Sequence, residues 1–182
     1  DNGNDNMILA YPGRLGVAGV FLDMIREIPM DDNLKKLLQE EQELQFGHFN
    51  ELTAWKLGSL LVEMGLQRGL AISVDITRGE HQLFHASLPG TSADNDEWIK
   101  RKVRLVYRFG HSSFYMGQLL KSKGKRIEES YLIPESLYAP HGGCFPVIVK
   151  GTGMVGTVTV SGLPQEEDHK LVTQAIRDFL AK

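Results

Sequence analysis

The sequence is poor in cysteine and in long apolar runs. Cys144 is the one cysteine among 182 residues, which excludes an internal disulfide and a zinc site built from paired cysteines. A chain with a single cysteine is typical of a protein in a reducing compartment, so we expect a cytoplasmic protein. No uninterrupted run of about 18 apolar residues is present, which excludes a membrane-spanning helix. Residues 7–22 are fairly apolar, but no basic segment precedes them, so we expect no signal peptide.

Motifs that mark common enzyme chemistries are also missing. The chain has no phosphate-binding loop, no glycine-rich dinucleotide turn, no zinc-protease helix and no nucleophile elbow. Whether the protein is an enzyme, and which residues would be catalytic, therefore stays open at the level of sequence.

Charge is nearly balanced overall and uneven along the chain. The net charge is -3, and 42 % hydrophobic with 24 % charged residues is typical of a soluble globular protein. Residues 95–126, however, hold nine Lys and Arg against two Asp and Glu, a net charge of +7. No aromatic stacking platform accompanies these cations. We therefore predict a small anionic ligand or a subunit contact, and no nucleic acid.

Changes in hydrophobic period predict the fold class. Apolar residues recur at helical spacing in some segments and alternate with polar residues in others. The expected helices are 32–44, 50–69, 95–109, 114–122 and one after Pro164, and the expected strands are 71–77, 82–87, 145–149 and 155–160. The link after residue 124 is expected to be extended. Two hairpins need no crossover, so the sequence predicts an α+β domain, an antiparallel sheet flanked by helices.

The domain is expected to begin near Met30. Asp31 and Asp32 can cap the first helix, and a chain of this length suffices for one domain with a substantial core. We predict a single domain over residues 30–182, preceded by an N-terminal extension, residues 1–29, outside the core fold.

The basic segment opens with an amphipathic helix. Arg101, Arg104 and Arg108 follow at steps of three and four, so their guanidinium groups share one face. Guanidinium groups pair with carboxylates and phosphates, which favours an anion site or an oligomer contact. The alternative is a solvated cationic face. Asp94 is one of several possible caps of this helix, and Asp96 and Glu97 suit the positive end of its dipole.

His111 lies in a short break between two expected helices, just before Ser112 and Ser113. Backbone N–H groups at a helix N-terminus can hold an anion, and the adjacent imidazole can donate, accept or ligate a metal. In the alternative interpretation, a serine caps the helix and His111 satisfies a backbone carbonyl.

A second histidine, His141, precedes Gly142, Gly143 and Cys144 at the start of an expected strand. Paired glycines allow the backbone to approach a ligand closely. We take His111 and His141 as candidates for one shared site. A nucleophile made of Cys144 and His141 is disfavoured, because a free cysteine opening an apolar strand is most often a small buried hydrophobe.

Acidic residues open the last expected helix. Glu166, Glu167 and Asp168 suit the positive end of its dipole, and His169 follows them. Side chains at these positions point in different directions around a helix, so we predict no metal site there. We expect the acids to pair with the arginine face of a neighbouring element or subunit.

Four ordered motifs of the chain resemble one family. They are DNDEWIKRK (94–102), RFGHSSFYMG (108–117), HGG (141–143) and SGLPQEEDH (161–169). Together they make residues 31–182 similar to functionally uncharacterised proteins of the GlcG/HbpS-like superfamily, often labelled the haem-degrading domain, which includes the C-terminal domain of PduO-type proteins. The resemblance implies a profilin-like fold and homo-oligomers. Some relatives bind haem or related tetrapyrroles, so the resemblance implies haem as the candidate cofactor.

Three functions follow from these observations. The first is a homo-oligomeric small-ligand-binding domain for haem or another anionic cofactor, with the candidate ligand-binding residues Arg101, Arg108, His111, Ser112, Ser113, His141, Gly142 and Gly143. The second is a non-catalytic oligomeric interaction protein, with a contact or charge network of Asp94, Asp96, Trp98, Arg104, Glu166, Glu167, Asp168 and His169. The third is an enzyme acting on a small anionic metabolite, with His111 as acid or base.

Overall fold

The computed structural model describes residues 31–182, and the predicted extension over residues 1–29 lies outside this part of the chain. In chain order the elements are α2 (Asp32–Glu43), α3 (Glu51–Gln67), β1 (Ser73–Arg78), β2 (His81–Ser87), α4 (Ala93–Phe109), α5 (Ser113–Ser122), α6 (Ile127–Tyr131), β3 (Cys144–Val149), β4 (Gly153–Ser161) and α7 (Gln165–Leu180). The strands form one antiparallel sheet in the order β2-β1-β4-β3. The predicted α+β class is confirmed.

Local sequence accounts for the ends of the central helices. The Asn50 side chain accepts a hydrogen bond from the backbone N–H of Thr53 at 2.9 Å and starts α3. Gly110, with φ of 70°, ends α4 in the left-handed conformation that glycine adopts freely. Ser112 caps α5 by accepting from the backbone N–H of Tyr115 at 3.2 Å. Helix α6 is the one described element that the sequence analysis missed, because five residues are too few for a helical period to show.

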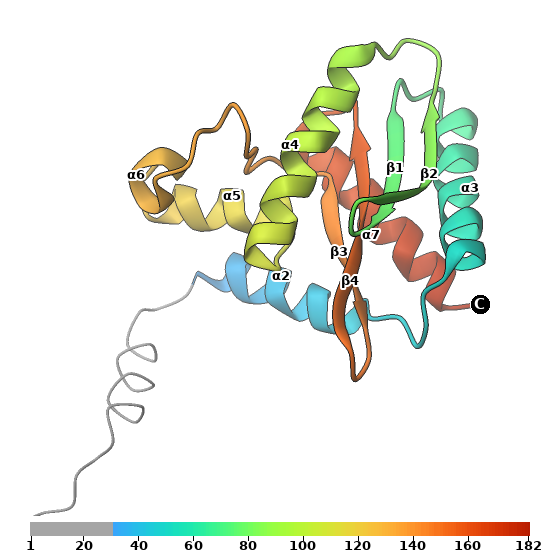
Figure 1. Ribbon diagram of the computed structural model, residues 1–182, viewed down its shortest axis with the longest axis horizontal. Helices are drawn as coiled ribbons and strands as arrows, with labels where there is room; N and C mark the ends of the chain where they lie inside the picture. Colours follow the sequence, from blue (N-terminus) through green and yellow to red (C-terminus); the bar gives the residue numbers. More distant parts are fainter. Residues whose placement is uncertain (1–30) are drawn as a thin grey trace, which may run out of the picture. The chain divides into compact units, whose positions relative to one another are not determined.

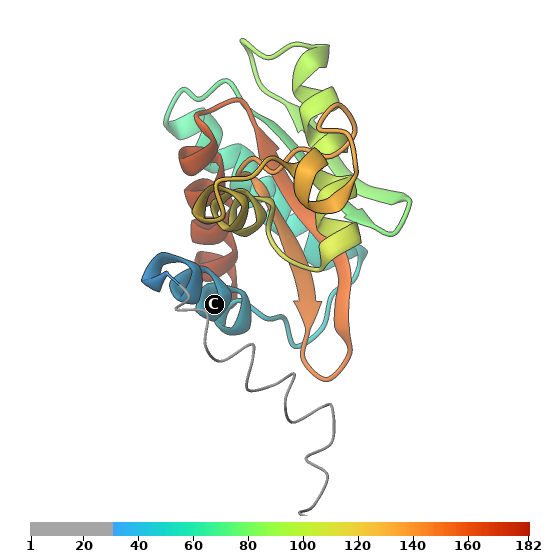
Figure 2. The ribbon, with the colours of Figure 1, turned by 90° about the vertical axis from the view of Figure 1, so that its left-hand side faces the viewer.

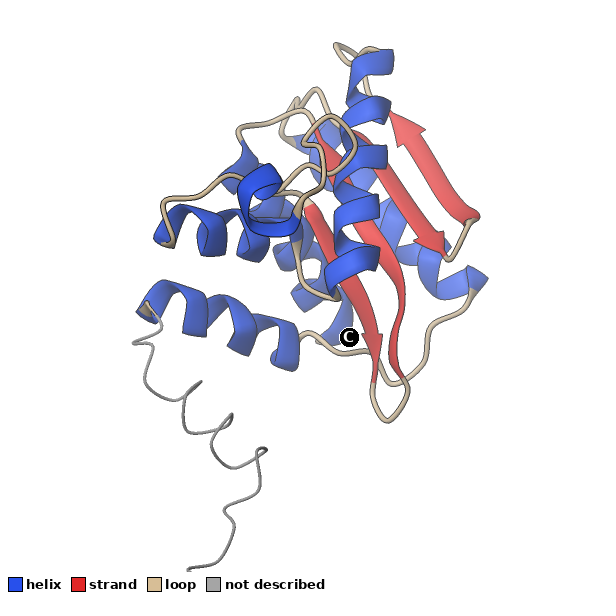
Figure 3. Ribbon diagram, turned by 60° about the vertical axis from the view of Figure 1, so that its left-hand side comes forward, coloured by secondary structure: helices blue, strands red, loops and turns tan. Residues whose placement is uncertain are grey.

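The helices cover the sheet in layers (Figure 1). Helix α4 lies across one face of the sheet, whereas α3 and α7 pack against the other, as Figure 3 also shows. Helices α2, α5 and α6 lie together on the side of β3 (Figure 2). The first turn of α4 and the start of α7 thus approach each other at one end of β4.

The two faces of the sheet differ in chemistry. Along β1, Val74 and Ile76 face the large apolar core formed with α3 and α7. The alternate residues Ser73, Asp75 and Thr77 point to the opposite face, because successive side chains of a strand alternate. Strands β4 and β3 continue both patterns through their register with β1. The face toward α4 is therefore polar and yet buried, with Ser73, Asp75, Thr157, Thr159 and Ser161 all nearly inaccessible.

A second, smaller core holds α2 and α5 to the rest of the domain. It contains Leu34, Leu37, Leu105, Phe114, Tyr115, Met116, Leu120, Ile127 and Ile133. Because Leu105 belongs to α4, this core fixes the C-terminal half of α4, while the N-terminal half is left to border a cavity.

Candidate functional site

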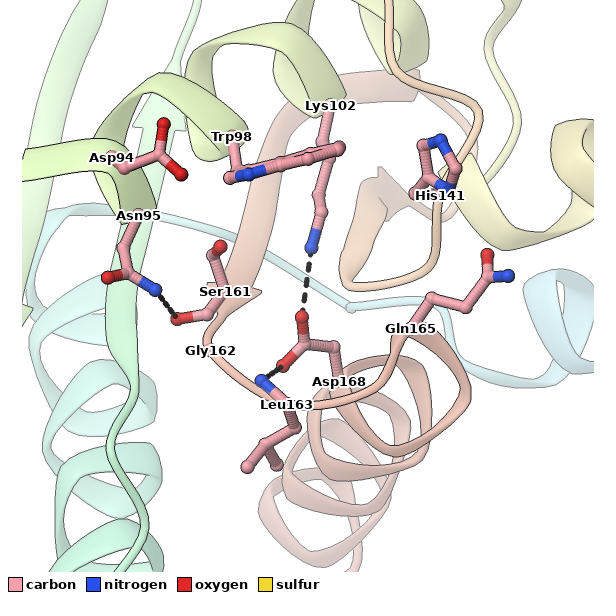
Figure 4. Close-up of a pocket in the computed structure, with 10 residues that line it drawn as sticks. All are labelled: Asp94, Asn95, Trp98, Lys102, His141, Ser161, Gly162, Leu163, Gln165 and Asp168. Atoms are coloured by element: carbon pink, nitrogen blue, oxygen red, sulfur yellow. Dashed lines mark hydrogen bonds and ion pairs between the residues drawn. The ribbon is translucent and has the colours of Figure 1, made fainter. Parts of the chain in front are cut away.

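A cavity of about 420 Å³ lies where α4, β4 and α7 meet, and we call it the Trp98 pocket. Its lining residues are Asp94, Asn95, Trp98, Lys102, His141, Ser161, Gly162, Leu163, Gln165 and Asp168 (Figure 4). The α4 residues recur every three or four positions, so one helix face supplies Asp94, Trp98 and Lys102. The pocket draws on three of the four sequence motifs.

A buried ion pair forms the floor of the Trp98 pocket. Lys102 Nζ lies 3.0 Å from Asp168 Oδ2, and the two side chains are 4 % and 2 % exposed. Lys102 also donates to the Val160 carbonyl at 3.1 Å, and Asp168 Oδ1 accepts the backbone N–H of Leu163 at 2.9 Å. Burial raises the pKa of Asp168, and the Lys102 ammonium opposes that rise. The pair joins α4 to the start of α7.

The two glycines after His141 are required by this close packing. A Cβ at Gly142 would overlap the Gln165 carbonyl at the start of α7. A Cβ at Gly143, where φ is 122°, would lie 2.7 Å from Lys102 Nζ. The Gly142 N–H also donates to Gln165 Oε1 at 3.3 Å. Both glycines therefore serve to seat the His141 loop beside the ion pair.

Aromatic rings form one wall of the Trp98 pocket. The rings of Trp98 and His141 meet edge to face with centroids 5.4 Å apart. The guanidinium of Arg101 lies 3.9 Å from the centroid of the Trp98 ring, in a cation–π contact. Arg101 therefore helps to hold the indole in place and does not line the pocket itself. His141 Nε2 lies 3.1 Å from Glu135 Oε1, which fixes the imidazole in place.

A second cavity of about 280 Å³, the basic pocket, adjoins the first. It is lined by Gly117, Gln118, Leu120, Lys121, Lys125, Arg126, Ile127, Glu135, Pro140, His141 and Gln165. His141 and Gln165 line both cavities, so the two meet at these side chains. The lysines and the arginine come from the end of the basic segment 95–126.

His111 lies away from this site, with different partners. Its Nδ1 is 2.7 Å from Glu41 Oε2, and its ring centroid is 4.8 Å from that of Tyr115. His111 lines neither the Trp98 pocket nor the basic pocket. The structure therefore does not bring His111 and His141 together, because a whole length of α4 separates the His111 break from Trp98.

The residues around His111 hold the domain together. Glu41 is buried and accepts the backbone N–H of Ser112 at 2.7 Å, which ties α2 to α5. The hydrogen bond to Glu41 raises the pKa of His111. Ser113 Oγ accepts the backbone N–H of Cys144 at 3.0 Å and joins α5 to β3. Ser112 and Ser113 thus have structural partners in place of a ligand.

The acids of α7 do not meet the arginine face within the chain. Glu166 and Glu167 pair with Lys170 of their own helix at 3.4 and 3.1 Å, and Asp168 pairs with Lys102. His169 is buried against Phe114, with Nε2 at 3.0 Å from Glu40. Helical spacing explains the Lys170 pairs, since residues three and four apart are neighbours on the surface.

The remaining two arginines are on the outside of α4. Arg104 is exposed, and the Arg108 guanidinium lies 5.6 Å from the centroid of the Tyr138 ring. Neither lines the Trp98 pocket or the basic pocket.

Asp96 points to a different cavity from Asp94. That cavity, about 510 Å³, lies between α4 and the β1–β2 edge. His85 stands between two carboxylates there, with Nδ1 3.6 Å from Asp75 and Nε2 3.5 Å from Asp96. Burial raises the pKa of Asp75.

Cys144 is unsuited to nucleophilic chemistry. The thiol is fully buried in the polar layer, and burial raises its pKa to about 12. Within residues 31–182, no group of three or more His, Cys, Asp and Glu is arranged to hold a metal ion. No helix in this described part is long and apolar enough to cross a bilayer.

Sequence reasoning missed Lys102 and Gln165 as members of the site. The signal for Lys102 was present: it falls on the apolar face of α4, four residues after Trp98, where a lysine is unexpected. Ser161, Gly162 and Leu163 were quoted only as parts of a motif, and nothing in the sequence set Gln165 apart from its neighbours.

Several known proteins are similar to this chain in sequence or in fold. Residues 49–177 match the family described as Haem degrading protein HbpS-like. A UPF0303 protein of Streptomyces coelicolor is 47 % identical over 154 residues, which cover 85 % of this chain and 98 % of that protein. The crystal structure of Ybr137w protein is 30 % identical with a TM-score of 0.77, over 89 % of this chain and 94 % of the other. The PduOC:Heme complex, 17 % identical with a TM-score of 0.59 over 71 % and 93 % of the chains, shares the fold.

Proposed function

The chain belongs to the family of HbpS-like haem degrading proteins, and from this premise we propose that it binds a small anionic molecule across the Trp98 pocket and the basic pocket. Together the two cavities offer an aromatic wall, a buried amine and a cationic end. Such a combination of a shaped cavity with a few convergent polar groups is typical of a small-molecule site.

The junction of the two cavities at His141 is the observation that carries this proposal. Among the residues that line the basic pocket, Lys121, Lys125 and Arg126 are opposed by one carboxylate, that of Glu135. Arg126 also pairs with Glu128 at 3.4 Å, which leaves the two lysines as the main surplus of positive charge. A surplus of positive charge at the end of a cavity attracts anions and orients them. An anionic group held there leaves the rest of the ligand next to Trp98 and Lys102.

Haem is the ligand to which the family name points, and the residues of one chain do not fit it. A haem needs an apolar slot on both faces of its ring and a free axial ligand. Only Trp98 and Leu163 are apolar side chains among the lining residues of the Trp98 pocket. His141 is the one histidine that lines the Trp98 pocket, and its Nε2 is paired with Glu135. A smaller and more polar molecule suits this lining better, with its anionic group in the basic pocket.

The proposal can be tested through the fluorescence of Trp98. The chain has two tryptophans, so a Trp55→Phe variant leaves Trp98 as the single reporter. Titration with pyruvate and with citrate should change its emission saturably, whereas potassium chloride at equal ionic strength should not. Lys125→Glu should weaken the response by about tenfold or more, since it reverses a charge in the cavity. Lys123→Glu, on the same segment but outside the lining, is the matched control.

Two results would overturn this assignment. One is the absence of a saturable response to either carboxylate, with Lys123→Glu and Lys125→Glu indistinguishable. The other is a saturable Soret shift with hemin that His141→Ala abolishes, which would assign the site to haem.

A second candidate function, self-assembly, is favoured by a different surface. Leu52, Trp55 and Leu66 are exposed along the outer side of α3, with Trp55 61 % exposed. Trp55 also packs on Phe84 of β2, the strand at one edge of the sheet. Exposed apolar patches beside a free strand edge favour association with another chain.

Light scattering distinguishes this surface from the arginine face of α4. Trp55→Glu should lower the mass of any assembly, and Lys56→Glu on the same helix should leave it unchanged. A loss of mass with Arg101→Glu but not with Trp55→Glu would instead place the contact on α4.

A further inference from the structure

Lys102 is an amine held in an unusual place. It lies on the floor of the Trp98 pocket with 4 % of its side chain exposed. Two of its three N–H groups are taken by Asp168 Oδ2 and the Val160 carbonyl. Among residues 31–182 no acceptor takes the third. These two hydrogen bonds fix the orientation of the Lys102 amine, and its third N–H can be donated to a ligand in the Trp98 pocket.

Stability alone does not account for this ion pair. Replacing a buried pair by apolar side chains of similar size is often neutral or stabilising, so such pairs are weak evidence for a structural purpose. Buried lysines, by contrast, serve as imine-forming amines in enzymes because removal from water favours the neutral amine. At Lys102 the adjacent Asp168 carboxylate is placed to take the proton that the amine must lose.

We propose that Lys102 forms an imine with a small carboxylate that also carries a carbonyl group, such as a 2-oxo acid, bound in the Trp98 pocket. This inference rests on the proposed function and narrows its ligand class. The carboxylate of the ligand points toward the basic pocket, and its carbonyl carbon lies at Lys102 Nζ. Trp98 and His141 flank the remainder of the molecule.

The step balances without any further reactant. The Lys102 ammonium gives a proton to Asp168, and the free amine attacks the carbonyl carbon to form a C–N bond. A second nitrogen proton moves to the former carbonyl oxygen. That oxygen then leaves as water with the proton returned by Asp168, while a C=N bond forms. The product is an iminium on Lys102 facing the Asp168 carboxylate, and one water is released.

Reductive trapping tests the inference on the intact chain. Incubation with pyruvate and sodium cyanoborohydride should convert the iminium into a stable carboxyethyl-lysine. Peptide mapping should place this modification on Lys102 before any exposed lysine. Lys102→Arg should abolish it, and Lys100→Arg, an exposed lysine of the same helix, should not. Asp168→Asn should slow trapping by about 100-fold, the effect of losing a general acid–base group.

The outcomes separate this inference from the proposed function. Modification of exposed lysines with Lys102 unmodified, while pyruvate still changes Trp98 fluorescence saturably, overturns the imine and leaves anion binding intact. Absence of both trapping and the fluorescence response overturns both. Mapping of the wild-type chain gives the answer even if a variant at Lys102 fails to fold.

Discussion

The two faces of the sheet are built on different principles. The face toward α3 and α7 is closed by aliphatic and aromatic side chains, among them Leu57, Leu61 and Phe145, all fully buried. The face toward α4 is closed by hydroxyls and charges that pair with each other: Ser73 with Ser87 and Thr77 with Thr157, each at 2.8 Å. The first face contributes stability through removal of apolar surface from water, whereas the second combines satisfied hydrogen bonds with a few buried apolar residues of α4, Ile99 and Val106 among them.

The contrast between the two faces shows where a small domain can place polar groups that bind a ligand. Buried polar groups are retained only where each has a partner, since an unpaired group is expensive. The polar layer ends at the Trp98 pocket, where a ligand can supply the missing partner. The apolar face has the packing needed to hold the sheet rigid.

The largest expected effect comes from breaking the ion pair. Lys102→Met should cost about 3–5 kcal/mol in the free energy of unfolding, because Asp168 is left buried and unpaired. The double variant Lys102→Met with Asp168→Leu should recover most of that loss. Urea denaturation measures both, with Lys100→Met as the exposed control. If the single and double variants lost equal free energy of unfolding, the unpaired charge of Asp168 could not be the cause of the loss.

A large effect is expected on the apolar face. Leu61→Ala should cost about 2–5 kcal/mol through lost burial and a cavity between α3 and the sheet. Leu66→Ala on the exposed side of the same helix should cost under about 0.5 kcal/mol. Thr159→Val on the polar face loses one hydrogen bond, to Cys144 Sγ at 3.1 Å, and should cost about 1 kcal/mol. If Thr159→Val lowered the free energy of unfolding as much as Leu61→Ala does, the two faces would not differ in their contribution to stability.

A smaller and pH-dependent effect is expected at Asp75. Because burial raises its pKa in the folded state, the charged form destabilises the fold, and stability is lost as the pH rises through that raised pKa. Asp75→Asn should therefore have a higher Tm than the wild type at about pH 8, with the gain fading toward about pH 4. Gln82, His85 and Asp96 are the polar neighbours of this carboxyl. Glu63→Gln, at an exposed carboxylate, is the control, and a gain that does not change with pH would argue against burial as the cause.

The smallest effect is expected at His111. The hydrogen bond to Glu41 raises its pKa, so its contribution is fully present below about pH 6.5 and is lost as the pH rises through the folded-state value. His111→Asn should lower Tm most at about pH 6, and the difference should shrink toward about pH 9. His48→Asn is the comparison, at an exposed histidine. A Tm difference that grows with pH would show that Glu41 does not hold the charged imidazole.

Much of the fold could be predicted because helix caps and hydrophobic periodicity, both local features of the sequence, determine where its helices and strands lie. Asn50, Gly110 and Ser112 mark helix ends as expected, and the alternation from Ile72 to Thr77 predicts β1. The family resemblance stated from the four motifs is also confirmed. Helix α6 was missed because it is short, and its turn ends at Leu132 in a left-handed conformation with φ of 55° that no local signal marks.

The site was predicted less completely because it depends on contacts between distant segments. His141, Trp98 and Asp168 lie together, but their grouping depends on how α4 and α7 cross the sheet. The basic segment divides in the structure: Arg104 and Arg108 lie outside the two pockets, whereas Lys121 and Lys125 line one of them. Spacing along one helix cannot reveal which of several cations borders a cavity formed by a different part of the chain.

The ion pair on the pocket floor also constrains how the sequence can diverge. Loss of either Lys102 or Asp168 alone leaves a buried charge, whereas replacement of both by apolar residues removes that cost to stability. Chains that have lost only one of the two residues should therefore be less stable than chains with both or with neither. Lineages that keep one member should keep the other, and those that abandon the pair should replace both residues.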